Sequence, residues 1–241
     1  MRVTLARPDF SRIKAVFFDA GGTLFQPHPS VGEIYAEVAL KFGLAVDPKK
    51  IEELFHDLWE KRDGLAGLSS HSSEKVEREW WRSLVGEVFS KFGTIERFDE
   101  FFTELYDRFA RPESWRIFPD VLSVFEVLKR QGKILGIISN WDSRLFSICE
   151  GLGLEPYLDF ILASAVVGAA KPSPKIFKEA IQRARVSPEE ALHIGDSLED
   201  DILGAQRSGI QTVFLNRKGS RTSESFTIST LHELMEPLQS S

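Results

Sequence analysis

Apolar and polar positions form two different patterns along this chain of 241 residues. From Arg116 onward, short apolar runs alternate with segments of helical periodicity. The apolar runs predict buried strands at 133–140, 160–163, 191–194 and 212–215. Strands that alternate with helices are typical of a parallel sheet covered by helices on both faces. The pattern therefore predicts an α/β fold built on a doubly wound, Rossmann-like parallel sheet.

The helices predicted in this half of the chain have recognisable start and stop signals. Ser173 followed by Pro174 is typical of an N-cap and a first helical residue. Acidic residues open another predicted helix at 199–207, where they favour the positive end of the helix dipole. A final helix is predicted at 231–238.

The segment 30–111 differs, because its periodicity is helical almost throughout. Three apolar stripes, which start near Pro48, Val76 and Phe98, predict three amphipathic helices. Asp47 directly before Pro48 is typical of a helix start. The segment therefore predicts a helical bundle inserted into the α/β pattern.

An apolar run at 15–18 precedes the helical segment and predicts the first strand of the sheet. We therefore expect an α/β core of residues 1–27 and 115–241, with a helical cap domain of residues 28–114. In this arrangement the cap would lie over whatever site the sheet carries.

Charge and cysteine content narrow the partners and the compartment. The net charge of −6 provides no basic face for nucleic acid. Cys149 is the only cysteine, which agrees with a reducing compartment. No apolar run approaches the ~18 residues needed to cross a membrane, and the first residues do not resemble a secretory signal. We expect a cytoplasmic protein without nucleic-acid or membrane partners, and the sequence leaves the oligomeric state open.

Polar side chains recur at four predicted strand ends. They are Asp19 after the first strand, Ser139 and Asn140 at the second, Lys171 after the third, and Asp196 after the fourth, with Asp200 and Asp201 just beyond. Because doubly wound sheets bind ligands at the carboxyl ends of their strands, we expect these groups to converge. Carboxylates together with substrate phosphate are typical ligands of Mg²⁺. The pattern favours an anionic substrate held with a hard cation.

Four motifs in order carry a family resemblance along nearly the whole chain. They are DAGGTL at 19–24, IISN at 137–140, the lysine of AAKPSPKIF at 171, and GDSLEDDILGA at 195–205. With them the chain resembles the haloacid dehalogenase-like hydrolase superfamily, and the inserted helices resemble its C1-capped subgroup. Two segments of the cap, EREWW at 77–81 and ELYDRFARPESW at 104–115, are similar to the dehalogenase-like hydrolase domain-containing protein 3 type.

The resemblance implies catalytic roles for individual residues. Asp19 would be the nucleophile and would form an aspartyl-phosphate. Mg²⁺ would be held by Asp19, Asp196 and the backbone carbonyl of Gly21. Ser139 would donate a hydrogen bond to a phosphoryl oxygen, and Lys171 would neutralise charge between the nucleophile and the phosphoryl group.

The resemblance also implies supporting roles around this centre. Asp201 would orient Lys171 or a water molecule at the metal, and the spacing leaves Asp200 as its rival. Gly22, Thr23 and Asn140 would contact the substrate.

The resemblance is incomplete at Gly21. Phosphatases of the family usually carry a second Asp at this position, which protonates the leaving group. Glycine offers a carbonyl but no side chain, so the general acid is missing. Such proton transfer is typically worth roughly 10²–10⁴-fold in rate. His28 is a candidate replacement because histidine titrates near neutral pH, although it is as readily a plain linker residue.

The preferred hypothesis is a hydrolase of phosphoric monoesters that acts on a small phosphorylated metabolite. One alternative is a weakly active or inactive phosphate-binding regulatory protein on the same fold. Another is phosphonatase chemistry with a cap lysine, of which Lys61 is the first candidate, or dehalogenase chemistry, against which Asp196 argues. Trp141 follows the second motif and either lines the site entrance or packs away from it.

Overall fold

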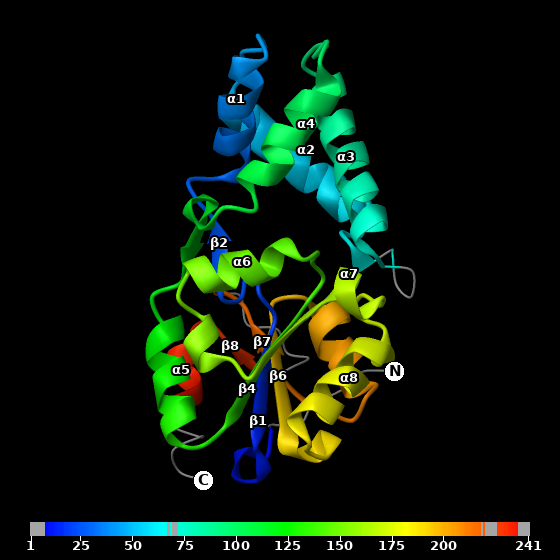
Figure 1. Ribbon diagram of the computed structural model, residues 1–241. Helices are drawn as coiled ribbons and strands as arrows, with labels where there is room; N and C mark the ends of the chain where they lie inside the picture. Colours follow the sequence, from blue (N-terminus) through cyan, green and yellow to red (C-terminus); the bar gives the residue numbers. More distant parts are fainter. Residues whose placement is uncertain (1–7, 67, 69–71, 218, 220–225, 236–241) are drawn as a thin grey trace.

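A six-stranded parallel sheet forms the centre of the molecule (Figure 1). The computed structural model describes residues 8–66, 68, 72–217, 219 and 226–235. The strands are β1 (Ala15–Phe18), β4 (Ile134–Ser139), β5 (Phe160–Ala163), β6 (Ala191–Gly195), β7 (Gln211–Leu215) and β8 (Thr227–Ile228). Their order is β5-β4-β1-β6-β7-β8, so the chain winds outward in both directions from β1. The predicted doubly wound α/β sheet is therefore confirmed.

The register of the central strands brings the predicted site residues to one edge. Phe18, the last residue of β1, lies level with Ile137 in β4 and Ile194 in β6. The residues that follow on each strand therefore leave the sheet side by side. Asp19 and Asp196 emerge from this shared edge at the centre of the sheet, next to the switch point where ligands of such folds bind.

Both faces of the sheet are buried, as the apolar strand sequences predict. Val16 and Phe18 belong to one apolar cluster and Ala15 and Phe17 to the other, since side chains alternate along a strand. The first face is covered by α5 (Val121–Arg130), α6 (Arg144–Gly151) and the 3₁₀ turn η7 (Leu231–Leu234). The second is covered by α8 (Pro174–Ala184) and α9 (Gly204–Gln206).

Four helices form a separate layer beyond the carboxyl edge of the sheet (Figure 1). They are α1 (Val31–Lys41), α2 (Pro48–Lys61), α3 (Glu74–Ser90) and α4 (Phe98–Arg108). They share an apolar cluster of their own. The starts of α2 and α3 follow from their caps, because the side chains of Asp47 and Ser73 accept hydrogen bonds from backbone N–H groups of the first turn. The sequence indicated α2, α3 and α4 as discrete helices but did not separate α1.

A two-stranded antiparallel ribbon connects the helical layer to the sheet. It pairs β2 (Phe25–Pro27) with β3 (Trp115–Ile117), and neither strand was predicted. The proposed boundaries of the cap, 28 and 114, fall at the end of this ribbon. The division into a core and a cap domain itself stays a prediction.

The last predicted helices differ in type from the expectation. The segment predicted as 199–207 begins with a π-helical turn, η6 (Leu198–Leu203), before α9. The predicted helix at 231–238 is a 3₁₀ turn as far as Leu234, because Leu231 and Leu234, three residues apart, are both fully buried. Residues 236–238 lie outside the described part of the chain. Among the described residues, no helix combines the length and apolarity needed to span a membrane.

Candidate active site

Asp19 leaves β1 at the carboxyl edge of the sheet and is only 7% exposed. Its backbone N–H donates to the carbonyl of Ile194, 2.9 Å away, which extends the sheet by one bond. Ser139 Oγ (3.0 Å) and Lys171 Nζ (2.7 Å) both donate to the same carboxylate oxygen, Oδ1. Burial raises the pKa of Asp19, and the charge of Lys171 opposes that rise. The predicted nucleophile, hydroxyl and lysine therefore meet at one atom.

Lys171 is buried between two carboxylates, those of Asp19 and Asp201. Burial of the ammonium lowers its pKa, but the two carboxylates more than compensate and raise it. The side chain of Asn140 holds the backbone of Lys171 from both sides. Its Oδ1 accepts from the Lys171 N–H (2.6 Å) and its Nδ2 donates to the Lys171 carbonyl (2.9 Å).

This clamp gives Asn140 a role beside the predicted substrate contact. It positions Lys171, which approaches from a segment 31 residues further along the chain. One N–H of the Asn140 amide is not used by the clamp, so a contact to a phosphoryl oxygen stays a prediction.

Asp201 is the acid that orients Lys171. Its Oδ1 accepts from Lys171 Nζ and lies 2.9 Å from His193 Nε2, and its Oδ2 accepts from the Ser197 N–H at 3.0 Å. Although burial alone would raise it, the pKa of Asp201 is lowered by Lys171 and His193. A side chain at position 195 would collide with this carboxylate, because a Cβ built on Gly195 lies 2.1 Å from Asp201 Cγ. Gly195 therefore makes room for Asp201.

Asp200, the rival acid, has a different environment. It is only half-buried, and its backbone N–H donates to Ser197 Oγ at the start of η6. Burial and then the nearby carboxylates of Asp201 and Asp63 raise its pKa to about 7, against the opposing charge of Lys171. No hydrogen bond ties the Asp200 carboxylate to Lys171 in the described structure. The geometry thus favours Asp201 over Asp200 for the supporting role.

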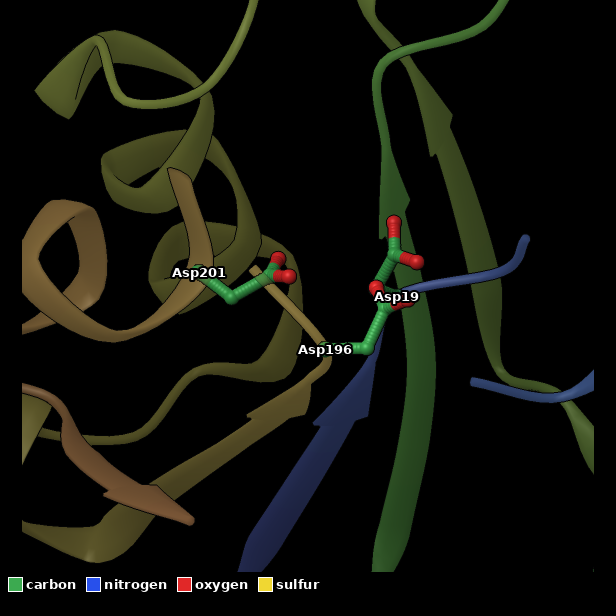
Figure 2. A group of neighbouring side chains, drawn as sticks. All are labelled: Asp19, Asp196 and Asp201. Carbon is green, nitrogen blue, oxygen red and sulfur yellow. The ribbon is translucent and has the colours of Figure 1, made fainter. Parts of the chain in front are cut away.

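Three carboxylates gather where a cation could bind. One oxygen from each of Asp19, Asp196 and Asp201 lies within 4.8 Å of the other two (Figure 2). The residue Asp196 is exposed, but its carboxylate lies against the protein. Desolvation, and then the charges of Asp19 and Asp201, raise its pKa well above the usual range. Both oxygens of Asp201 are used by Lys171, His193 and Ser197, whereas the side chains that bond Asp19 use only its Oδ1, so Asp19 and Asp196 are the pair best placed for a cation.

This donor set is suitable for Mg²⁺. The ion prefers oxygen ligands and typically takes only one or two carboxylates from the protein. A cation between Asp19 and Asp196 would also relieve the repulsion that, after desolvation, contributes to the raised pKa of Asp196. The orientation of the Gly21 carbonyl toward such an ion stays a prediction.

The loop after Asp19 is shaped by Gly22. Gly22 has φ +80°, and a Cβ there would lie 2.1 Å from Asp196 Oδ2, so only glycine fits. Its N–H donates to the carbonyl of Phe25 at 2.9 Å. Thr23 is fully buried, and its carbonyl accepts from Arg217. The substrate contacts at Gly22 and Thr23 stay predictions that this geometry does not favour, because the amide of Gly22 is used within the loop and the side chain of Thr23 is buried.

An aromatic ring covers position 21, where the family acid is missing. A Cβ built on Gly21 would lie 3.1 Å from Cζ3 and 3.7 Å from Cη2 of Trp141, and among the described residues nothing else is within 4 Å. The Trp141 ring packs against Phe25 and Trp115, with ring centroids 5.7 and 5.0 Å apart. An apolar wall therefore stands directly beside position 21.

His28, the candidate acid, and Lys61, the candidate cap lysine, are both engaged with other side chains. His28 Nε2 is 2.7 Å from a guanidinium nitrogen of Arg116, which only donates, so in this contact the imidazole nitrogen accepts. Lys61 is exposed on α2 and pairs with Asp57 at 2.6 Å, one turn away on the same helix. This position is typical of a non-catalytic lysine on the solvent-exposed face of a helix. The role of His28 stays a prediction that this geometry does not favour.

Sequence reasoning overlooked two buried polar groups. His193, the partner of Asp201, is fully buried in β6, and the only signal is a polar residue inside the apolar strand ALHIG. Glu77 of α3 is also fully buried and accepts from the hydroxyls of Ser72 and Ser164. Burial raises the pKa of Glu77 to about 7. In the sequence, Glu77 is indistinguishable from a surface acid of an amphipathic helix.

Glu77 joins the helical layer to the site. Ser164, at the start of the short helix α7 (Ser164–Val167), accepts from the backbone N–H of Trp141 at 2.9 Å. A second link runs from α4, where the hydroxyl of Tyr106 donates to Asp142 at 2.5 Å. Both contacts reach the segment that directly follows Ser139 and Asn140, so the helical layer rests on the loop that carries two site residues.

Comparisons with known proteins agree with this geometry. A family model described as haloacid dehalogenase-like hydrolase matches residues 13–209. The chain is 32% identical to haloacid dehalogenase-like hydrolase domain-containing protein 3 of Danio rerio, over 87% of this chain and 88% of that protein. It is 29% identical to the rhythmically expressed gene 2 protein of Drosophila melanogaster, over 86% and 85% of the two chains.

Two solved structures show the same fold in proteins of different activity. One is a HAD phosphatase from Thermococcus onnurineus, with a TM-score of 0.66, 29% identity, and coverage of 94% of this chain and 98% of that one. The other is a 2-haloacid dehalogenase from Pseudomonas syringae pv. Tomato, with a TM-score of 0.64, 26% identity, and coverage of 95% and 99%. The fold alone therefore does not choose between the two reactions.

Proposed function

The chain belongs to the haloacid dehalogenase-like hydrolase family, and from this premise we propose that it is a Mg²⁺-dependent phosphatase of a small phosphate monoester. The observation that carries the proposal is the meeting of Ser139 and Lys171 at one oxygen of Asp19, beside the carboxylate of Asp196. Catalysis of phosphoryl transfer is mainly positioning and charge stabilisation. Asp19 would be the positioned nucleophile, the ammonium of Lys171 would stabilise charge, and the Asp196 carboxylate would help to hold the metal.

In the first step, a carboxylate oxygen of Asp19 attacks phosphorus. The new P–O bond makes an aspartyl-phosphate, and the bond to the leaving oxygen breaks with its electron pair going to the leaving group. The departing anion takes a proton from solvent. In the second step, water attacks phosphorus, the acyl-phosphate P–O bond breaks, Asp19 is restored as a carboxylate, and the protons of the water leave with the inorganic phosphate or pass to solvent. Lys171 and Ser139 hold the nucleophile in one orientation throughout and donate to the phosphoryl oxygens as charge builds on them.

The metal would be held by the carboxylates of Asp19 and Asp196 and by the Gly21 carbonyl. When bound, Mg²⁺ supplies neutralisation of the phosphoryl charge. Asp201 keeps Lys171 charged and in place through their buried contact. The acid pair also argues against the dehalogenase alternative, because a metal site would have no purpose in metal-free halide displacement.

The helical layer would act as a cap over this centre, with residues 28–114 as the mobile unit. Its contacts to the site run through Glu77 with Ser164 and through Tyr106 with Asp142. The ribbon of β2 and β3 is then the natural hinge, because it is the covalent connection between the layers.

The test is a screen of phosphate monoesters with Mg²⁺ and with EDTA, on the wild type and on Asp19→Asn. We expect Mg²⁺-dependent release of phosphate that Asp19→Asn abolishes. Asp107→Asn, an exposed acid on α4, is the matched control and should behave as wild type. Full activity of Asp19→Asn on every ester would overturn the proposal.

A second candidate is a phosphate-binding protein with little or no turnover, which the missing acid at Gly21 favours. Inorganic phosphate that binds in the presence of Mg²⁺, as measured by calorimetry, without hydrolysis of any ester in the screen would select it. Borohydride trapping of a cap lysine would select the phosphonatase alternative, and halide release without Mg²⁺ would select the dehalogenase alternative.

A further inference from the structure

Three consecutive residues at the end of β4, from Ser139 to Trp141, each face the proposed site in a different way. Ser139 donates to Asp19, and Asn140 clamps Lys171. The next residue, Trp141, has its backbone fixed at both ends, because its N–H donates to Ser164 Oγ (2.9 Å) and its carbonyl accepts from the Ala165 N–H (3.1 Å). Its side chain is thus presented from a rigid segment, directly beside the catalytic groups.

The Trp141 ring and Gly21 are complementary in shape. A Cβ at position 21 would approach the ring edge to 3.1 Å, which is tighter than an ordinary carbon–carbon contact. A side chain at position 21 would therefore require the indole to shift by a few tenths of an ångström. Glycine at this position lets the ring lie directly against the loop that follows Asp19.

The ring has little freedom to move aside. It is held edge-on against Trp115 and Phe25, which are themselves in contact with centroids 5.4 Å apart. Centroid separations of this size are favourable for aromatic pairs. Trp141 and Trp115 remain partly exposed. They therefore offer an apolar surface beside Gly21, which follows the proposed nucleophile by two residues.

The missing acid and the apolar wall point to the same substrate class. Without a proton donor, the leaving oxygen departs as an anion, which a phenol with a pKa of about 10 tolerates. An aliphatic alcohol, whose pKa is closer to the ~15.7 of water, does not. A phenol also has the planar face that packs on an exposed indole.

We propose that Trp141 is a specificity-determining residue whose indole occupies the space of the missing acid and packs against an aromatic leaving group, so that aryl phosphates are preferred to alkyl phosphates. The inference rests on the proposed phosphatase function. It adds the substrate class and names the residue that selects it.

The first test compares phenyl phosphate with trifluoroethyl phosphate, an ester of an acidic alcohol without a ring. We expect Trp141→Leu to raise KM for phenyl phosphate about 3–10-fold relative to trifluoroethyl phosphate, which is the range of one lost aromatic contact. Trp141→Phe should restore most of the preference for phenyl phosphate. Trp80→Leu, which removes a tryptophan from the helical layer, is the control and should leave the ratio of the two KM values unchanged. Inhibition by inorganic phosphate should not change, because it reports the phosphoryl site alone. An unchanged ratio of the two KM values would overturn the inference.

The second test returns the acid to position 21 with and without the ring. We expect Gly21→Asp alone to give no gain in ethyl phosphate turnover over the wild type, since the Trp141 ring crowds the new side chain. Gly21→Asp with Trp141→Ala should raise it at least ~10²-fold, the lower range of general acid catalysis. An equal gain from Gly21→Asp alone would contradict the shared-space argument.

The two tests separate this inference from the function on which it rests. If the wild type hydrolyses esters with Mg²⁺ and Asp19 but Trp141 changes neither result, the inference alone fails. If no ester is hydrolysed by any variant, the proposed function fails and the inference fails with it.

Discussion

The two sides of the loop that carries Asp19 are built from opposite chemistry. On one side Lys171, Asp201 and His193 form a continuous buried chain of charged and polar contacts. On the other side Trp141, packed against Phe25 and Trp115, lies beside Gly21, and these three side chains offer no titratable group. The charged side is suited to bind and neutralise a phosphoryl group, and in the proposed reaction the aromatic side would receive the leaving group without donating a proton.

This contrast explains which changes should be costly. A buried charge is tolerated only with its partners, so the position of each charged group depends on the others. The aromatic side depends on shape alone, and a smaller ring there leaves the charges undisturbed. Changes on the charged side should therefore remove activity, and changes on the aromatic side should redistribute it among substrates.

Asp19→Asn should have the largest effect, because it removes the nucleophile at the centre of the charged side. We expect kcat to fall at least ~10⁴-fold, as for lost nucleophiles in other covalent enzymes. The measurement is phosphate release from phenyl phosphate with Mg²⁺, with the circular dichroism spectrum as a control for folding. A fall of less than tenfold would remove Asp19 from the chemistry.

Asp201→Asn and Asp200→Asn form a matched pair that tests which of the two acids supports Lys171. Asp201 orients Lys171 and its loss should lower kcat/KM about 10–100-fold, as for other residues that position a catalytic group. Asp200, whose carboxylate makes no such bond in the described structure, should tolerate the change within about threefold. The reverse ranking of the two variants would assign the supporting role to Asp200.

Glu77→Gln should change how the stability of the protein depends on pH. Glu77 belongs to the contacts that join the helical layer to Trp141. Burial raises the pKa of Glu77 from 4.5 to about 7, and Asp142 and Glu74 face it as further acids. Below pH 4.5 the carboxyl is protonated in both folded and unfolded states, and its full contribution is present. As pH rises to about 7, only the unfolded state releases the proton, and stability is lost.

The loss amounts to roughly 3 kcal/mol of unfolding free energy. We therefore expect the free energy of unfolding of the wild type, relative to Glu77→Gln, to fall by about that amount between pH 4.5 and 7. Urea titrations across this range measure it, and Glu79→Gln, an exposed acid on the same helix, is the control. Parallel curves for wild type and Glu77→Gln would show that Glu77 titrates normally.

His28→Gln should have the smallest effect. Glutamine can keep a hydrogen bond to Arg116 and cannot act as an acid near neutral pH. We expect kcat/KM for ethyl phosphate and for phenyl phosphate to change less than about twofold. A loss confined to ethyl phosphate, where protonation matters most, would identify His28 as the missing acid.

The sequence predicted the charged side of the site well because one rule of topology covers it. Parallel strands end at a common edge, so Asp19, Ser139 and Asp196 had to meet once their strands were identified. Helix starts such as Asp47 with Pro48 were equally predictable, since capping depends on neighbours in sequence.

The remaining features depend on partners far apart in the chain. Trp141 covers Gly21 across 120 positions, and Glu77 meets Ser164 across 87. The clamp of Asn140 on Lys171 also leaves no local signal in the sequence. Periodicity and capping do not encode such contacts, so they required the folded structure.

The most direct test of the account is to locate the covalent intermediate. Enzyme turning over phenyl phosphate is quenched rapidly and treated with borohydride, which reduces an acyl phosphate to an alcohol, and the modified residue is identified by peptide mass spectrometry. The account predicts homoserine at position 19, in place of Asp19, only when both Mg²⁺ and substrate are present. Turnover without reduction at Asp19, or reduction at another carboxylate, would contradict it.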